Sequence, residues 1–326
     1  MKNVDQSQPW NLHRDCFVDP PLSGGKLPHT AQLISTGELA QRLHDPSLVL
    51  IEVASPKEVR EAPHRIPECH RLWRTDYQLP VTPSQPLDGL APSVQQFQEL
   101  TTRLGIHEES ELVLLDRQYD ATRLWWLFCL FGKEKVRLLD GGYKAAAKEG
   151  LVTSLDAPSN VENGTWEPLA PKREILATLQ DILSLSLVDN PRLWDVRTIE
   201  EYTGAVTLVG AKKGGRIPWA SSRLDWSMFR DPIDGFWSEP AQIRKIAMNK
   251  MLEEDEDDKF GSNVHTFYCQ SGVRTTQLIF GLSLAGWPLD QLKNYDGSWI
   301  EWSHGDGAIA AGLQPGFRGK PSSKFL

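Results

Sequence analysis

One cysteine in this chain of 326 residues is surrounded by residues that favour a reactive thiol. Cys269 follows the apolar, β-prone segment 264–268 and opens a short polar loop that contains Gly272. Residues 275–284 then have the composition of an apolar helix, so backbone N–H groups and a helix N-terminus should converge on the sulfur. Both favour negative charge, and Arg274 adds a full positive charge. This arrangement predicts a lowered thiol pKa and a nucleophilic Cys269.

The alternative interpretation of Cys269 is a plain core residue, since free cysteines are among the most buried residue types. The polar loop, the arginine and the helix start that follow it favour the reactive thiol. The other cysteines are scattered and lack the spacing of metal ligands: Cys16, Cys69 and Cys129. We therefore expect no metal site, no cofactor, no disulfide framework and a reducing compartment.

Composition indicates a globular protein with a sizeable core, because 40% of the residues are hydrophobic and 24% are charged. The net charge of −8 argues against nucleic-acid binding and against an anionic membrane surface. The sequence has no run of about 18 apolar residues, so we expect no membrane span. Its first residues lack the apolar run of a signal peptide, which favours a cytoplasmic location.

The two halves of the chain repeat one series of motifs at similar spacings. The corresponding motifs are Glu52-Val53 and Asp195-Val196, Arg65-Ile66-Pro67 and Arg216-Ile217-Pro218, Leu114-Leu115-Asp116 and Phe267-Tyr268-Cys269, and Asp140-Gly141-Gly142-Tyr143 and Asp296-Gly297-Ser298-Trp299. Strands and helices alternate in both halves, which predicts an α/β fold of two tandem domains. Each domain should be a parallel sheet with helices on both faces, and ligands should bind at the carboxyl ends of the strands.

Prolines and polar residues set the expected boundaries of these domains. We expect an extended arm over residues 1–30, a first domain over 31–155, a linker over 156–171, a second domain over 172–312 and a tail over 313–326. The periodicity of residues 172–187 predicts one helix, and the acidic run 253–258 is expected to be a solvated loop.

Comparison of the halves predicts which domain is chemically active. At the position of Cys269 the first half has Asp116, which cannot become a persulfide. At the position of Arg197 it has Ala54. The first domain is therefore expected to be catalytically silent and the second to be catalytic.

These motifs resemble the rhodanese superfamily, in particular the tandem two-domain sulfurtransferases that act on thiosulfate or 3-mercaptopyruvate. The resemblance covers roughly residues 30–312. It is carried by Asp195-Val196-Arg197, by Gly215-Arg216-Ile217-Pro218, which is similar to the family's Gly-His-Ile-Pro, by the Cys269 loop, and by Asp296-Gly297-Ser298-Trp299-Ile300-Glu301-Trp302.

The resemblance implies that Cys269 takes a sulfane sulfur from a small anionic donor as a persulfide. It then passes the sulfur to cyanide or to a thiol, such as thioredoxin or glutathione. Loop N–H groups from Gln270 to Arg274 should stabilise the persulfide anion, and Gly272 lets the backbone curl around it. The expected substrate-binding residues are Arg197, Gln270, Ser271, Gly272, Val273 and Arg274. For Arg197, a structural ion pair with Asp195 or a neighbouring acid is an equally weighted alternative.

The sequence of the Cys269 loop leaves the donor open. It reads Cys-Gln-Ser-Gly-Val-Arg, whereas thiosulfate-specific relatives have Cys-Arg-Lys-Gly-Val and mercaptopyruvate-specific relatives Cys-Gly-Ser-Gly-Val. Phosphatases and arsenate reductases with a Cys-x5-Arg loop are a rival class, but this loop is one residue shorter and suits sulfur better than phosphate. A non-catalytic binding or regulatory module is the second alternative, against which the retained Cys269, Gly272 and Arg274 argue.

Overall fold

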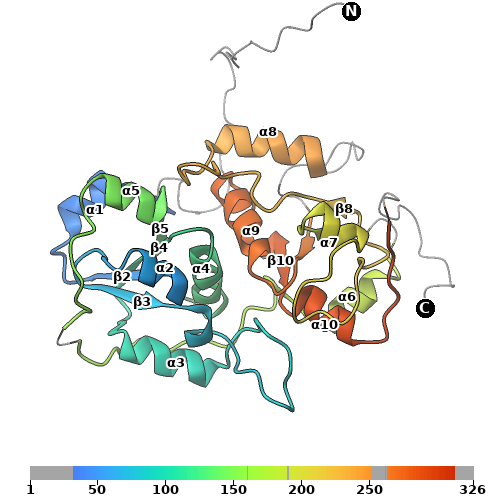
Figure 1. The fold of residues 1–326 in the computed structure, drawn as a ribbon, viewed down its shortest axis with the longest axis horizontal. Coiled ribbons are helices and arrows are strands. Elements are labelled where there is room, and N and C mark those ends of the chain that lie inside the picture. The colour runs from blue at the N-terminus through green and yellow to red at the C-terminus, as the bar shows by residue number, and fades with distance from the viewer. Residues whose placement is uncertain (1–31, 160, 189–190, 252–260, 262, 313–326) are drawn as a thin grey trace, which may run out of the picture.

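Two parallel five-stranded sheets, one in each half of the chain, form the framework of the protein (Figure 1). The computed structural model describes residues 32–159, 161–188, 191–251, 261 and 263–312. The expected arm over 1–30, the acidic loop over 253–258 and the tail over 313–326 lie outside these residues, as does Cys16. No helix of the described part is long and apolar enough to cross a membrane.

The two sheets have the same topology. The first has the order β1-β5-β4-β2-β3, with strands Leu33–Ile34 (β1), Leu48–Val53 (β2), Cys69–Leu72 (β3), Glu111–Asp116 (β4) and Val136–Leu139 (β5). The second has the order β6-β10-β9-β7-β8, with strands Leu176–Ala177 (β6), Leu193–Asp195 (β7), Ser222–Arg223 (β8), His265–Tyr268 (β9) and Leu292–Tyr295 (β10). Replacing β1 to β5 by β6 to β10 in turn converts one order into the other. The predicted tandem α/β fold is confirmed.

Helices alternate with these strands. In the first half they are Thr36–Arg42 (α1), Pro56–Glu61 (α2), the 3-10 helix Arg74–Asp76 (η2), Val94–Arg103 (α3), Ala121–Leu130 (α4) and Gly142–Lys148 (α5). In the second they are Leu179–Leu185 (α6), Ile199–Thr203 (α7), Pro240–Met251 (α8), Arg274–Leu284 (α9), the 3-10 helix Leu289–Gln291 (η3) and Ser298–His304 (α10). Both copies of the Arg-Ile-Pro motif form the same antiparallel bridge, from Arg65 to Ser154 and from Arg216 to Ala310.

Helices α4 and α9 lie side by side where the two halves meet (Figure 1). All residues of α4 except Cys129 are buried, because one side of the helix packs on its own sheet and the other on α9. The rings of Trp125 and Phe280 meet edge to face at 4.8 Å, and the hydroxyls of Thr122 and Thr276 are 3.0 Å apart. The first domain therefore contacts the helix that follows Cys269.

The prediction of a single helix over residues 172–187 is wrong. Residues 176–177 form strand β6, which pairs with β10, and helix α6 begins only after Thr178. Thr178 caps that helix, and Asp181 completes a capping box. A two-residue strand has no periodicity of its own, so pairing with a distant strand overrides the local helical pattern.

Candidate active site

Cys269 lies at the carboxyl end of a strand, as the sequence predicted; this strand is β9, which pairs with β7 and β10. Helix α9 begins at Arg274, so the intervening loop is closed by a helix N-terminus. The side chain of Cys269 is buried, with 1% of its surface exposed. The sulfur therefore lies at the bottom of its loop, where surrounding dipoles act with little screening by water.

The surroundings of Cys269 lower the pKa of its thiol. Burial alone raises this pKa, but the charge of Arg274 and the backbone N–H groups of Thr275, Ser271 and Arg274 outweigh it. The net result is a pKa below the ordinary value of 9.0. Burial instead raises the pKa of Cys69 and of Cys129. Among the cysteines that the structure describes, Cys269 is thus the one set up as a thiolate.

Ser298, which the sequence prediction missed, organises this loop. Its hydroxyl accepts hydrogen bonds from the N–H groups of Cys269, at 3.1 Å, and of Gly272, at 3.0 Å. It donates one to the carbonyl of Tyr295, at 2.7 Å. Ser298 is fully buried and has a φ of +49°, a left-handed conformation that is costly for a residue with a Cβ. The three hydrogen bonds of its hydroxyl offset this strain, and they fix both ends of the turn.

Gly272 forms the tight turn of the loop in a left-handed conformation, with a φ of +68°. A Cβ there would lie 2.7 Å from the carbonyl oxygen of Asp296, so glycine is required. Its N–H group donates to Ser298 rather than pointing to the sulfur. The expectation that the N–H groups from Gln270 to Arg274 all face the sulfur therefore needs correction: the structure directs those of Ser271, Arg274 and Thr275 to it.

Arg274 forms a two-point ion pair with Glu201 of α7, a second residue that the sequence prediction missed. Its two terminal nitrogens each donate to one carboxylate oxygen at 2.7 Å. Both side chains are largely buried, with 13% of Arg274 and 4% of Glu201 exposed. The pair fixes the position of the arginine and partly neutralises its charge. The main effect of Arg274 is therefore to lower the pKa of the nearby Cys269 thiol, rather than to bind a free anion.

Arg197 forms the ion pair with Asp195 that was the alternative to donor binding. Its terminal nitrogen lies 2.6 Å from a carboxylate oxygen of Asp195 and 2.7 Å from the carbonyl of Gly215. The guanidinium lies 4.4 Å from the ring of Trp299, and 1% of the side chain is exposed. These contacts place Arg197 against Trp299, the residue that follows Ser298.

The remaining candidate residues differ in exposure. Gln270 and Ser271 are half-buried, and the amide of Gln270 donates to the carbonyl of Val209 at 3.2 Å. Val273 is buried, and its carbonyl accepts a hydrogen bond from the hydroxyl of Thr276 at 2.7 Å, which anchors the start of α9. The outer surface of the loop is therefore formed by Gln270 and Ser271.

The corresponding loop of the first domain is closed by an ion pair. Asp116 accepts the N–H of Ala121 at 2.9 Å with one oxygen and contacts Arg230 of the second domain at 3.0 Å with the other. The position of Ser298 is taken by Gly142, whose φ of +54° is nearly the same. The first loop thus shares the left-handed residue at this position, but it has no thiol, no bridging hydroxyl and, with Tyr119 at the position of Gly272, no left-handed turn there.

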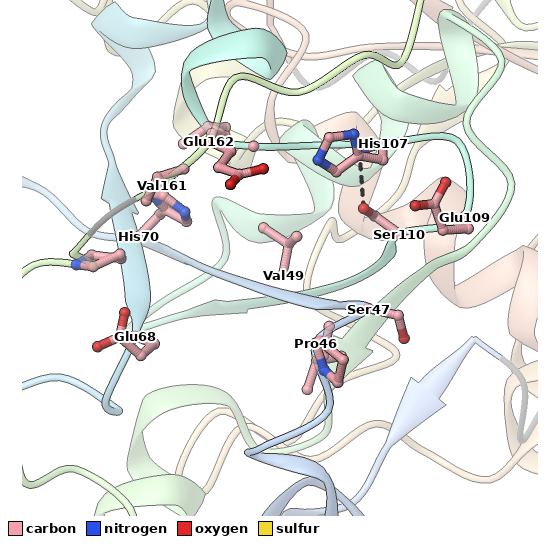
Figure 2. A pocket seen from close by; sticks show the side chains of 14 residues that line it. Pro46, Ser47, Val49, Glu68, His70, His107, Glu109, Ser110, Val161 and Glu162 are labelled. Carbon is pink, nitrogen blue, oxygen red and sulfur yellow. Dashed lines mark hydrogen bonds between the residues drawn. The ribbon is translucent and has the colours of Figure 1, made fainter.

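A hollow of about 490 Å³ in the first domain is remote from these loops (Figure 2). Residues that precede or begin strands β2, β3 and β4 line it, together with linker residues near Val161. Figure 2 shows the hydrogen bond in which the hydroxyl of Ser110 accepts the N–H of His107 at 2.9 Å. Because ligands of parallel sheets bind at the carboxyl ends of strands, the Cys269 loop remains the candidate site. Within the described ranges, no group of three or more metal-ligating side chains comes together.

Comparison with known proteins agrees with the geometry of the two domains. The family model of the rhodanese-like domain matches residues 35–149. The Mycobacterium bovis protein named "Putative thiosulfate sulfurtransferase 1" is 30% identical over 280 residues, which cover 83% of this chain and 94% of that protein. The sulfur carrier protein TtuD of Thermus thermophilus is 29% identical over 289 residues, covering 85% and 95%.

Solved structures show the same fold. The Tum1 protein of Saccharomyces cerevisiae has a TM-score of 0.72 at 19% identity, covering 88% of this chain and all of that one. The anaerobic ergothioneine biosynthesis enzyme of Chlorobium limicola has a TM-score of 0.72 at 21% identity, covering 89% and 72%. The 30% identity to the Mycobacterium bovis protein over most of both chains, the family match and the repeated sheet topology establish that the chain belongs to the rhodanese superfamily and is a two-domain sulfurtransferase.

Proposed function

We propose that this sulfurtransferase moves a sulfane sulfur from thiosulfate or 3-mercaptopyruvate, through a persulfide on Cys269, to cyanide or a thiol. The observation that carries the proposal is the lowered pKa of the Cys269 thiol in a loop whose N–H groups surround the sulfur. A thiolate is the form of cysteine that attacks sulfur, and the same N–H groups suit the negative charge of a persulfide.

In the first step, the Cys269 thiolate attacks the outer sulfur of thiosulfate. A new bond forms between the sulfur of Cys269 and this outer sulfur. The sulfur–sulfur bond of thiosulfate breaks, and sulfite leaves with its electron pair. With 3-mercaptopyruvate, the carbon–sulfur bond breaks instead, and the carbon fragment takes up a proton and leaves as pyruvate. In the second step, cyanide attacks the terminal sulfur and leaves as thiocyanate, while the electron pair returns to Cys269. A thiol acceptor leaves as its own persulfide.

The residues around the sulfur have separate roles in this proposal. The charge of Arg274, positioned by Glu201, lowers the pKa of the thiol and so favours its ionised form. Gln270 and Ser271, at the outer surface of the loop, meet the anionic donor, while Gly272 and Val273 provide the turn and the helix start. We assign Arg197 to support of the loop through Trp299, because its guanidinium is buried and paired.

Two further observations support a proposal for the acceptor and for the location of the enzyme. A relative named as a sulfur carrier supports transfer to a thiol, and we propose a thiol such as thioredoxin or glutathione as the acceptor. The described cysteines Cys69, Cys129 and Cys269 are all free thiols, which supports a reducing, cytoplasmic setting.

The test measures thiocyanate formed from cyanide with either donor. Cys269→Ser should abolish the activity, whereas Cys129→Ser, the matched control, should retain it, because burial raises the pKa of Cys129. Comparison of thiosulfate with 3-mercaptopyruvate identifies the donor. Undiminished turnover by Cys269→Ser would disprove the assignment of the nucleophile.

A further inference from the structure

The first domain, whose own loop carries Asp116, reaches across the domain interface and holds the Cys269 loop. The contact is made by Arg123 of α4, whose side chain is 2% exposed. One terminal nitrogen donates to the carbonyl of Gly272 at 3.3 Å, and the other to the carbonyl of Gly89 at 2.8 Å. The guanidinium also lies 2.7 Å from a carboxylate oxygen of Asp296.

A segment of the first domain completes this contact. Its residue Ala91 donates its N–H to the second carboxylate oxygen of Asp296 at 2.7 Å. Gly89 lies directly against the loop: a Cβ there would be 2.8 Å from the Cβ of Ser271 and 2.9 Å from its carbonyl oxygen. Arg123 therefore joins three segments, namely the first domain near Gly89, the Cys269 loop and the turn after β10.

We propose that Arg123 is a positioning residue for the thiol of Cys269, an inference that rests on the proposed role of this cysteine as the nucleophile. The carbonyl of Gly272 is held by Arg123 and, at 3.0 Å, by the side-chain amide of Asn294. Fixing this carbonyl fixes the peptide plane between Gly272 and Val273, and Ser298 fixes the preceding plane through the N–H group of Gly272. The neighbouring N–H groups then stay directed at the sulfur without a cost of reorganisation.

The geometry of the guanidinium, rather than its charge, carries this role. Asp296 forms an ion pair with Arg123, and the charge that lowers the pKa of Cys269 most is that of Arg274. A planar guanidinium donates in several directions at once, whereas the ammonium of lysine is a point donor on a flexible chain. Arg123→Lys keeps the positive charge beside Asp296 but cannot hold both glycine carbonyls in the same way.

The domain interface also provides a matched control: an arginine that reaches from the second domain to the first. Arg230 of the second domain reaches across to the first loop, where it contacts Asp116 at 3.0 Å and the carbonyl of Gln118 at 2.6 Å. Arg230→Lys therefore perturbs an interdomain arginine of the same kind without touching the Cys269 loop.

The experiment measures the rate at which iodoacetamide alkylates Cys269 as a function of pH, with the modified peptide quantified by mass spectrometry. For Arg123→Lys we expect alkylation at neutral pH to be about tenfold slower and the pH profile to move upward, the size of effect that follows from losing one hydrogen bond to the thiolate. Arg230→Lys should stay within about twofold of the unchanged protein. A profile of Arg123→Lys that superimposes on that of the unchanged protein, or an equal shift in Arg230→Lys, overturns the proposal.

A second variant keeps the test valid if Arg123→Lys does not fold. Arg123 binds the carbonyl of Gly89, which has a φ of +90°. Gly89→Ala strains this turn, displaces the carbonyl from Arg123 and pushes a methyl group against Ser271, so it should also slow alkylation of Cys269. Unchanged alkylation in this variant contradicts the proposal. Alkylation requires no sulfur donor, so a failure of sulfur transfer in the unchanged protein would leave this result interpretable on its own.

Discussion

Replacement of Ser298 by alanine is the most informative perturbation of the loop. The substitution removes one hydroxyl and leaves the surrounding packing nearly unchanged. It deprives the N–H groups of Cys269 and Gly272 of their acceptor and the carbonyl of Tyr295 of a donor. We expect lower stability and lower activity together.

The structure sets the size of this effect. A buried polar group without a hydrogen-bond partner costs about 1–3 kcal/mol, and Ser298→Ala leaves two N–H donors in that state. Relaxation of the loop recovers part of this cost, so the free energy of unfolding should fall by about 3 kcal/mol. Displacement of a catalytic group by about 1 Å reduces rates roughly 100-fold, so we expect kcat/KM to fall by one to two orders of magnitude.

Urea unfolding and steady-state formation of thiocyanate measure the two effects, with Ser298→Gly as the control. Glycine adopts the left-handed backbone without the cost of a Cβ, as Gly142 does in the first domain. If the hydroxyl is what matters, both variants lose activity. Full activity of Ser298→Gly would show that the backbone shape alone suffices, and full activity of both variants would refute the role of the hydroxyl.

Three further predictions concern the charges and the turn around the thiol. The rate of alkylation of Cys269 should rise with pH to a plateau, with a midpoint below pH 9.0, because its thiol pKa is lowered; a midpoint at or above that value contradicts the account. Burial raises the pKa of Glu201 but Arg274 outweighs it, so the folded-state pKa lies below 4.5. The resulting stability is present above pH 4.5 and is lost as the pH falls through the lowered pKa. Urea unfolding of Glu201→Gln should therefore lack this acid-dependent loss, and its stability near neutral pH should be about 3 kcal/mol lower, because a buried charge loses its partner. Gly272→Ala should abolish thiocyanate formation, since its Cβ would lie 2.7 Å from the carbonyl of Asp296; an active variant with the same loop would contradict the need for glycine.

The local features of the Cys269 loop could be predicted because their signals lie close together in the sequence. A β-prone segment, a cysteine, a glycine and an apolar helix follow one another between residues 264 and 284. Strand β9, the left-handed turn at Gly272 and helix α9 match this pattern. Each depends on propensity and steric limits that act over a few residues.

The residues that hold the loop could not be predicted, because they come from distant parts of the chain. Glu201 is 73 residues from Arg274, and Arg123 is 149 residues from Gly272. The Thr198-x-x-Glu201 capping box at the start of α7 is a signal for a helix N-terminus, but it carries no information on the ion pair of Glu201 with Arg274. One signal for Ser298 was present in the sequence: the repeated motif has Gly142 in the silent copy and serine in the active one.

The short strands at the edges of the sheets were also beyond prediction. Strands β1 and β6 have two residues each, and both exist only because a neighbouring strand offers hydrogen bonds. In β6, this pairing interrupts a segment with helical periodicity. Such elements are set by tertiary contacts and leave no pattern in the sequence.

The most direct test of the central claim is the intact mass of the protein after treatment with thiosulfate, with the modified peptide identified by fragmentation. The account predicts a gain of one sulfur atom on Cys269, its loss on addition of cyanide, and no gain in Cys269→Ser. A sulfur atom found on Cys69 or Cys129 instead, or a gain that persists in Cys269→Ser, would contradict it.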